Sequence, residues 1–245
     1  MKDLCLVINT FSKYSDVWQM FFDSLDKHFP DVKRYVFVDE GSEPDKNSTT
    51  IHYNKEDLFR TQFIKCIEQV PEKYCIFISE DYILYDDVRT DLVKRYKDVL
   101  EENKNLTFIK FVKGMDFGEP KYNNYDDLYE MSNVFPYFYS QSASLWKTRD
   151  LEKIFKHTPD SHIAGQDMSQ QLEILANNTC QLLDIQGLFC YNGEEKVGIY
   201  HYDNIVFPHI ATALVKGKWN LSEYRDKLMP LLKKYKIDPQ IRGIY

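Results

Sequence analysis

The feature that most constrains the fold is a short apolar run, Tyr74–Ile78, which ends directly in Ser79, Glu80 and Asp81. Five consecutive residues with strand preferences are typical of a strand buried on both faces, as in the middle of an α/β sheet. Ligands bind at the carboxyl ends of strands in such sheets, and two adjacent carboxylates there are costly unless a ligand uses them. A divalent cation with a diphosphate would give Glu80 and Asp81 a partner. A polar turn before the next helix is the alternative.

Strand-like and helix-like segments alternate along the first half of the chain. The apolar residues of the expected helices recur at spacings of three and four, whereas the expected strands are short apolar runs. This alternation predicts an α/β fold with a mostly parallel central sheet flanked by helices. The expected strands are Leu4–Ile8, Tyr35–Val38, Ile51–Tyr53, Tyr74–Ile78 and Leu106–Val112, and the expected helices are 15–29 (capped by Ser15), Glu56–Val70 and Val88–Leu100.

The second half begins with a long stretch, Gly114–Asn133, that is rich in Asn, Asp, Tyr and Gly. A loop of this length inside a compact domain is uncommon, which favours a lid or binding loop, with disorder as the alternative. No repeat or clear linker interrupts the chain, so we expect a single domain over residues 1–245. Further strands are expected at Ser140–Trp146, Gln181–Tyr191 and Val197–His201, and further helices at Thr148–Phe155, Gln166–Ala176, Phe207–Val215 and Leu221–Tyr235.

Composition narrows the classes of function. The net charge of −7 argues against a general nucleic-acid binder, because phosphate backbones require a basic surface. The 18 tyrosines suit a sugar or nucleobase site as well as a core. Five cysteines show no CxxC pair, which favours buried free thiols. The first apolar run is too short for a signal peptide and no run approaches a membrane span, so we expect a cytoplasmic protein.

Three segments together resemble a group of bacterial and viral glycosyltransferase-like proteins with a GT-A fold. They are YSDVWQMFFDSLDKHFPD after the first strand, SEDYILYDDV after the central strand, and SQSASLWKTRDLEKI further on. The likeness spans residues 4 to about 220. It implies that a nucleotide-sugar donor binds within about 1–112 and an acceptor within about 113–220, followed by a C-terminal helix and tail over 221–245.

The same resemblance implies an Asp-x-Asp-like motif after the central strand, which holds Mn²⁺ or Mg²⁺ against the diphosphate of the donor. That position reads Ser79-Glu80-Asp81. Asp81 matches the last carboxylate and Glu80 offers a second oxygen ligand, whereas Ser79 stands where the full motif has Asp. Metal dependence is therefore open at this point. A late histidine often completes the metal shell, and His201 is the candidate, with a packed polar role as the alternative.

Other residues are candidates for binding the donor. Asn9 and Thr10 end the first strand, where GT-A proteins hold the nucleoside, and Asp39 ends the second, where a carboxylate often accepts hydrogens from the ribose or base. Ordinary turn chemistry explains all three equally simply. Arg60, on the helix before the central strand, could pair with the diphosphate in a two-pronged fashion. A surface arginine on a helix is the alternative.

The transfer reaction requires a base if the enzyme inverts the linkage, and Asp167 near a helix start resembles the acidic motif that supplies it. A helix N-terminal charge is the alternative. For the metal shell, His162 is a weaker alternative to His201. The aromatic cluster Tyr137, Phe138, Tyr139 and Trp146 suits a sugar platform or a core. Lysines near the C-terminus could contact a membrane or an anionic lipid-linked acceptor, or simply form a solvated face: Lys216, Lys218, Lys233, Lys234 and Lys236.

The leading hypothesis is a glycosyltransferase that moves a sugar from a UDP- or GDP-sugar to a glycan, lipid-linked or protein-attached acceptor. A nucleotidyltransferase is disfavoured, because the loop after the first strand, NTFSKYSD, lacks a Gly-rich basic phosphate loop. A non-catalytic nucleotide-sugar or glycan-binding protein of the same fold remains the alternative. Neither the donor sugar, the acceptor nor the stereochemistry is determined by the sequence.

Overall fold

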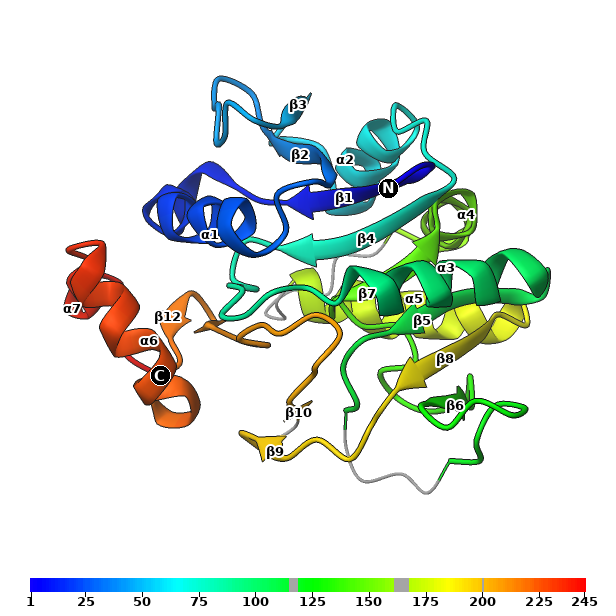
Figure 1. Cartoon of the computed structure of the whole chain (residues 1–245). Helices are drawn as coiled ribbons and strands as arrows, with labels where there is room; N and C mark the ends of the chain where they lie inside the picture. Colours follow the sequence, from blue (N-terminus) through cyan, green and yellow to red (C-terminus); the bar gives the residue numbers. More distant parts are fainter. Residues whose placement is uncertain (115–118, 161–167, 200) are drawn as a thin grey trace.

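One eight-stranded sheet runs through the protein (Figure 1). The computed structural model describes residues 1–114, 119–160, 168–199 and 201–245. The strand order is β3-β2-β1-β4-β7-β5-β8-β6. The strands are β1 (Leu4–Asn9), β2 (Lys33–Asp39), β3 (Thr49–Tyr53), β4 (Tyr74–Ser79), β5 (Leu106–Lys110), β6 (Leu128–Met131), β7 (Ser144–Lys147) and β8 (Gln186–Cys190).

Six of the eight strands point in one direction. β1 is parallel to both β2 and β4, β2 is parallel to β3, and β5 is parallel to β8. β7 lies antiparallel between β4 and β5, so those two strands share a direction, and β6 runs antiparallel to β8. The carboxyl ends of β1 to β5 and β8 therefore meet at one edge. This confirms the predicted mostly parallel α/β sheet, and it places Asn9, Asp39 and Ser79 at the edge where ligands bind such sheets.

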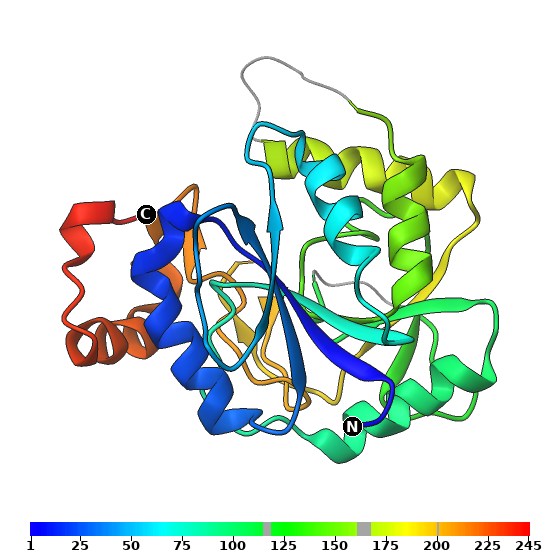
Figure 2. The ribbon, with the colours of Figure 1, turned by 90° about the horizontal axis from the view of Figure 1, so that it is seen from above.

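Helices cover both faces of the sheet, α1 and α3 on one side and α2, α4 and α5 on the other (Figure 2). Successive side chains of β1 alternate between the two faces, as a strand buried on both sides requires. Leu6 and Ile8 pack with Phe21 of α1, whereas Cys5 and Val7 belong to the core beneath the opposite helices. The helices are α1 (Ser15–His28), α2 (Phe59–Ile67), α3 (Thr90–Glu102), α4 (Thr148–His157) and α5 (Met168–Leu182).

The start of α1 differs from the prediction. A short 3₁₀ turn, η1 (Ser12–Tyr14), leads directly into the helix, and Ser15 is its first residue rather than its cap. Tyr14 holds the capping position without a side-chain hydrogen bond. The Ser12 side chain turns instead to Asp39, donating a hydrogen bond of 2.6 Å to its Oδ2. The loop after β1 is therefore tied to the end of β2.

The predicted helix at Phe207–Val215 is wrong. The segment runs alongside the turn after β4, where Ile210 N donates to Ile83 O at 2.9 Å and Tyr85 N donates to Pro208 O at 3.2 Å. It ends in a hairpin of β11 (Leu214–Val215) and β12 (Lys218–Trp219). Its apolar residues have helix-like spacing, but they are buried as an extended path in the core. Tertiary pairing outweighs a local periodicity here.

Three further boundaries are corrected. The long loop 114–133 contains β6, which pairs with β8. The expected strand Val197–His201 is a small hairpin, in which β9 (Lys196–Val197) pairs with β10 (His201–Tyr202) and Gly198 has φ +80°. Residues 181–182 end α5, so the expected strand Gln181–Tyr191 begins only at Gln186. The five cysteines are buried and free, as predicted.

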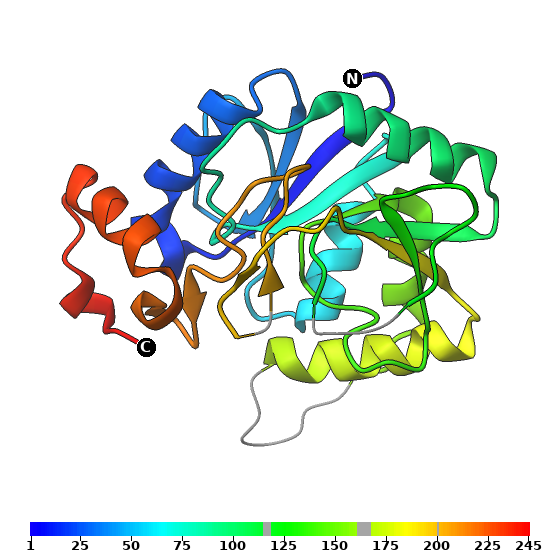
Figure 3. The same ribbon diagram turned by 60° about the horizontal axis from the view of Figure 1, so that its bottom comes forward.

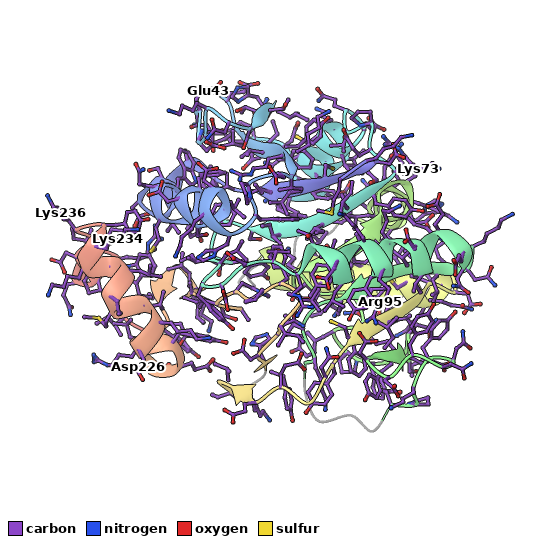
Figure 4. The ribbon with its side chains drawn as sticks, in the orientation of Figure 1. Glu43, Lys73, Arg95, Asp226, Lys234 and Lys236 are labelled. Atoms are coloured by element: carbon purple, nitrogen blue, oxygen red, sulfur yellow. The ribbon has the colours of Figure 1, made fainter. Side chains whose placement is uncertain are left out.

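The C-terminal segment packs beside α1 (Figure 3). It comprises α6 (Leu221–Lys234) and α7 (Pro239–Arg242). Arg242 pairs with Asp16 at the start of α1 and donates to Gly217 O at 3.1 Å. Lys234 and Lys236 are exposed at this end of the molecule (Figure 4). The predicted contact of these lysines with a membrane stays a prediction. Within the described ranges, none of the helices combines the length and apolarity needed to cross a bilayer.

Candidate functional site

A cavity of about 360 Å³ opens at the carboxyl edge of β4, β5 and β8. Its wall combines residues that are far apart in the sequence. Asp81 and Tyr82 follow β4, Lys110 ends β5, Glu173 comes from α5, and His201 comes from β10. Carboxyl, ammonium, imidazole and phenol groups thus face one space beside a sheet edge. Convergence of titratable groups in a cavity of this size is typical of a binding or active site.

The acidic pair after β4 is divided between two environments. Asp81 lines the cavity, and its Oδ2 accepts a hydrogen bond from Leu214 N at 3.4 Å. Burial raises the pKa of Asp81 to about 7. Glu80 lies among buried groups beside the end of β1; burial and the neighbouring Asp81 raise its pKa to about 8, opposed by a hydrogen bond with Thr10. Both carboxyl groups therefore exchange protons near neutral pH.

Lys110 is a buried cation in the cavity wall that the sequence analysis missed. Its Nζ donates to the carbonyl of Tyr137 at 2.5 Å and to Ser140 Oγ at 2.7 Å. Burial lowers the pKa of Lys110 to about 7. The available signal was a lysine that closes an otherwise apolar strand, LTFIK. A lysine at the carboxyl end of a buried parallel strand indicates a functional site as much as an aspartate does there.

The backbone at Tyr137 is strained. This residue has φ +70°, a conformation that is unusual for a bulky side chain. Its ring is 54% exposed and lines the cavity, while its carbonyl holds Lys110. Strained conformations of this kind cost about 1–3 kcal/mol and gather at ligand-binding walls.

In the cavity wall, His201 Nδ1 and Gln141 Nε2 are buried without a hydrogen-bond partner among the residues that the structure describes. Burial lowers the pKa of His201 to about 4, with a further contribution from Lys110, so its imidazole is neutral at pH 7. Gln141 N donates to Glu173 Oε1 at 2.7 Å, which fixes the carboxyl group in the wall. Buried polar atoms without partners are rare in folded proteins and suit a ligand.

The residues predicted to hold the nucleoside cluster at the ends of β1 and β2, outside the cavity wall. Both carboxylate oxygens of Asp39 accept hydrogen bonds of 2.6 Å, one from Ser12 N and one from Ser12 Oγ. Thr10 Oγ1 accepts from Trp18 Nε1 at 2.8 Å, and the carbonyl of Thr10 accepts from Tyr53 at 2.7 Å. Asn9 pairs in register with Phe37 and Ser79. The structure thus brings Asn9, Thr10, Asp39 and Glu80 together.

Arg60 lies neither in the cavity wall nor in the cluster at the ends of β1 and β2. Its Nε donates to Phe155 O and its Nη2 to Lys156 O, both at 2.8 Å, and its Nη1 pairs with Asp160 at 3.1 Å. These acceptors lie at the carboxyl end of α4, where a cation satisfies free carbonyl groups. The predicted diphosphate contact is therefore corrected to a helix-capping role. A local sequence pattern could not show that α4 ends beside this helix.

The three predicted metal ligands are not assembled as one set. Among the described residues, one group of three His, Cys, Asp or Glu side chains has its ligand atoms within 4.8 Å of one another. It consists of His28, Asp86 and Asp87 near the surface. Glu80, Asp81 and His201 do not form such a group. Asp81 and His201 nevertheless line the same cavity, whereas Glu80 is turned toward Thr10.

The predicted base, Asp167, lies outside the described residues, as does His162. The aromatic cluster is divided by the fold. Phe138, Tyr139 and Trp146 are buried in the core under α4 and α5, whereas Tyr137 faces the cavity. Core packing is therefore the role of three of these four residues.

Neither a family model nor a curated protein matches the chain. Among solved structures, S. aureus TarS 1–349 in complex with UDP is 12% identical over 98% of this chain and 67% of that one, with a TM-score of 0.49. CMP:2-keto-3-deoxy-manno-octonic acid synthetase complexed with CTP is 10% identical over 77% and 89%, with a TM-score of 0.47. The 2-C-methyl-D-erythritol 4-phosphate cytidylyltransferase of Thermus thermophilus is 15% identical over 79% and 92%, with a TM-score of 0.44.

The first of these structures holds UDP, the second holds CTP, and the third is a cytidylyltransferase. The chain spans 60% of TarS 1–349 without UDP and 37% of the longer TarS chain. Similarity this low concerns the path of the chain. Substrate and reaction have to be argued from the residues of the protein itself.

Proposed function

We propose that the protein is a glycosyltransferase that uses a nucleoside-diphosphate sugar. The observation that carries this proposal is the cavity at the carboxyl edge of β4 and β5, with Asp81 in its wall. Through the resemblance to GT-A proteins, Asp81 matches the last carboxylate of the motif that holds a metal ion against the donor diphosphate. The ends of β1 and β2, with Thr10 and Asp39, lie along the same sheet edge. One edge thus offers a nucleoside end and an adjoining space for the sugar and the acceptor.

In this proposal the nucleoside of a UDP- or GDP-sugar binds at Asn9, Thr10 and Asp39. The transferred sugar and the hydroxyl of a glycan, lipid-linked or protein-attached acceptor occupy the cavity. Tyr137 supplies an exposed ring on which the apolar face of a sugar can pack. Arg60 has no part in donor binding, because its donors are used at the end of α4.

The chemical step breaks the bond between the anomeric carbon and the diphosphate oxygen and forms a bond from the acceptor oxygen to that carbon. If the reaction inverts the linkage, a carboxylate takes the acceptor proton. Asp167 is the base predicted from the sequence. Glu173 is a described carboxylate in the cavity wall and is the second candidate. Glu173 lies within α5.

A Mn²⁺ or Mg²⁺ ion bound by Asp81 and His201 is part of the proposal. Carboxylate oxygen and neutral imidazole are suitable ligands, and burial keeps His201 neutral. The ion would neutralise charge on the leaving diphosphate. Glu80 is omitted as a ligand, because it hydrogen-bonds with Thr10 instead.

The decisive experiment is a thermal-shift measurement with UDP-, GDP- and CDP-sugars, with and without Mn²⁺, followed by donor hydrolysis. We expect one nucleotide class to raise the Tm and its sugar to be released slowly as free sugar. The variant Asp81→Asn should lose the metal-dependent part of the shift, whereas the exposed control Asp226→Asn should retain it (Figure 4). Absence of stabilisation by every nucleotide would contradict the proposal.

A non-catalytic nucleotide-sugar or glycan-binding protein is the second candidate. Two observations favour it: Ser79 replaces the first carboxylate of the acidic motif, and Glu80, Asp81 and His201 do not form one ligand group. Stabilisation by a nucleotide sugar without hydrolysis or transfer, with a range of acceptors, would support this candidate over the enzyme.

A further inference from the structure

The C-terminal end of the chain differs in charge from the rest of the protein. Residues 216–245 contain eight Lys or Arg residues and three Asp or Glu residues, whereas residues 1–215 contain 23 and 35. A segment with an excess of five positive charges thus belongs to a chain whose net charge is −7. This segment, with α6, α7 and the C-terminus, lies at one end of the molecule beside α1 (Figure 3). An anionic partner is therefore attracted to this end of the protein.

Two lysines belong to a small sheet that the C-terminal residues extend. In the hairpin of β11 and β12, Lys216 and Gly217 form the two-residue turn, with φ +50° and +75°, so Lys216 stands at its tip. Residues 243–245 run beside β12. Trp219 N donates to Gly243 O at 3.0 Å, and Tyr245 N donates to Trp219 O at 2.9 Å. The hairpin and the end of the chain therefore form one surface.

Lys218 and Tyr245 lie on the same face of this small sheet. The stem of Lys218 lies over Gly243, with its Cγ, Cδ and Cε 3.6 to 3.7 Å from the position that a β-carbon would take there. Because side chains alternate along a strand, Tyr245 projects to the same side as residue 243. Both side chains are exposed, the tyrosine to 53%. A long cation and an amphipathic ring on one face suit the boundary between water and lipid.

Ile241 adds an apolar side chain that the protein leaves in water. It is 87% exposed on α7, which packs beside β12. The next residue, Arg242, ties α7 to the hairpin turn, since its Nη1 donates to Gly217 O at 3.1 Å. Single exposed apolar residues are common in soluble proteins. An isoleucine that adjoins lysines and an exposed tyrosine has the composition of a surface that meets a membrane.

This surface adjoins the cavity along the chain. Ala211 and Thr212 line the cavity, and Leu214 N donates to Asp81 in its wall. Lys216 follows Thr212 by four residues, a length of chain that spans at most about 15 Å. The tip of the hairpin is therefore within about 15 Å of the cavity wall, measured between α-carbons.

From these observations we propose that the surface formed by Lys216, Lys218, Ile241 and Tyr245 docks the protein on an anionic membrane. The lysines meet lipid phosphate groups, whereas the isoleucine and the tyrosine ring enter the headgroup region. A nucleic acid would use the lysines but would leave Ile241 in water, so a lipid surface is the better match. Docking itself is independent of the proposed function. Its consequence, that the acceptor is the lipid-linked one of the three classes, rests on that function.

The test is co-sedimentation of the full chain with vesicles, without any nucleotide. Vesicles of phosphatidylcholine alone are compared with vesicles of phosphatidylcholine and phosphatidylglycerol in equal amounts. We expect the anionic vesicles to bind the protein about tenfold or more tightly at low salt. The difference should shrink at high salt, where the charges are screened. Equal binding to both kinds of vesicle, or binding to neither, would overturn the proposal.

Charge variants locate the contact on this surface. The double variant Lys216→Gln, Lys218→Gln should lower the affinity for anionic vesicles about twentyfold, because each lysine near such a surface contributes about fivefold. The matched control is Lys46→Gln, Lys55→Gln, which removes the same charge from exposed lysines on either side of β3. The control should bind as the wild type does. Equal losses in the two double variants would contradict docking through the C-terminal surface.

The apolar part of the surface is tested by Ile241→Ser, which should weaken binding to anionic vesicles about fivefold. Leu182→Ser is the matched control, since Leu182 is 85% exposed at the end of α5 and should leave binding unchanged. Both side chains are almost fully exposed, so neither substitution disturbs the core. Unchanged binding of Ile241→Ser would contradict insertion of this end into the headgroup region.

A further arm distinguishes the membrane from a nucleic acid and from the proposed function. Fluorescence anisotropy with labelled polyuridylate measures binding to a phosphate backbone. Binding of polyuridylate without binding of anionic vesicles would assign the surface to nucleic acid and overturn the proposal. Because the vesicle experiment uses no nucleotide, its failure leaves donor binding at Asp81 intact. Conversely, failure of every nucleotide sugar to bind leaves docking on the membrane as it stands.

Discussion

Two parts of one sheet edge differ in how their polar groups are satisfied. At the ends of β1 and β2, Asp39 and Thr10 are buried and bonded to neighbouring protein groups. At the ends of β4 and β5, Asp81 and Lys110 face a cavity, and their pKa values move toward neutrality. The first part is a closed hydrogen-bond network. The second holds charges that burial disfavours.

The difference separates a part of the edge whose polar groups already have partners in the protein from a part whose charged groups face a cavity. Hydrogen bonds of 2.6 Å offset the cost of burying Asp39, whereas the bond that Asp81 accepts from Leu214 N is long, 3.4 Å. Groups that are incompletely compensated reduce stability, and proteins retain them where a ligand or a reaction uses them. The predictions below test whether substitutions in the two parts change stability and function in opposite directions.

The largest effect is expected for Asp81→Asn. Donor turnover should fall by roughly 10²–10³-fold, as on removal of a group that stabilises charge in a transition state. Stability should change the other way. Because the folded pKa of Asp81 is raised to about 7, its stabilising contribution is present at low pH and is lost as pH rises through 7. At pH 8 the variant should therefore be about 4 kcal/mol more stable than the wild type.

Urea unfolding at pH 5 and pH 8, with turnover measured on the same samples, checks this prediction. The gain in stability should appear at pH 8 and shrink at pH 5, where the wild-type carboxyl group is protonated. Lower stability of Asp81→Asn at pH 8 would mean that the charged carboxylate is better compensated than its long bond to Leu214 N indicates.

In the closed part, Asp39→Ala should destabilise the protein by about 3 kcal/mol. It removes two hydrogen bonds to a buried carboxylate and leaves Ser12 N and Ser12 Oγ without their acceptor. Ser12→Ala tests the same contact from the other side and should cost less, because the backbone bond survives. Urea unfolding without ligand measures both. If neither variant lowered the free energy of unfolding, the hydrogen bonds between Ser12 and Asp39 would not be what stabilises the ends of β1 and β2.

Sequence patterns predicted the cluster at the ends of β1 and β2 better than they predicted the cavity. Asn9, Asp39 and Glu80 each end a buried apolar strand, and parallel strands necessarily bring such ends to one edge. The cavity depends on the antiparallel insertion of β7 between β4 and β5 and on the pairing of β6 with β8. No periodicity encodes those pairings.

The same reason explains the individual errors. Lys110 and Glu173, which no sequence pattern singled out, are far apart in the chain and meet only through the fold. Arg60 was read as a donor contact because the pattern around it is local, whereas its partners lie about a hundred residues later. Contacts between distant segments decide these roles, and one sequence carries no direct record of them.

Lys110→Met should change how stability depends on pH. The folded pKa of Lys110 is lowered to about 7 from 10.5, so the unfolded chain binds more protons between those values. Stability contributed by this group therefore rises with pH across that window. The variant should lack this rise, a difference of about 3.5 kcal/mol between pH 7 and pH 10. Urea unfolding at both pH values measures it.

Lys233→Met is the matched control, because Lys233 is exposed on α6. All other titrating groups are common to wild type and variants, so the comparison isolates Lys110. If the free energy of unfolding changed equally with pH in Lys110→Met and Lys233→Met, burial of Lys110 in the cavity wall would not cost stability.

The smallest effect is expected at Tyr137, where the cavity wall has φ +70°. Tyr137→Gly and Tyr137→Ala both remove the exposed ring, but only glycine adopts this conformation without strain. The glycine variant should therefore be about 1 kcal/mol more stable than the alanine variant in urea unfolding. Both should weaken sugar binding equally, because both lack the ring. If the two variants were equally stable, the backbone would carry no strain, and the contrast between the two parts of the edge would rest on the titratable groups Asp81 and Lys110 alone.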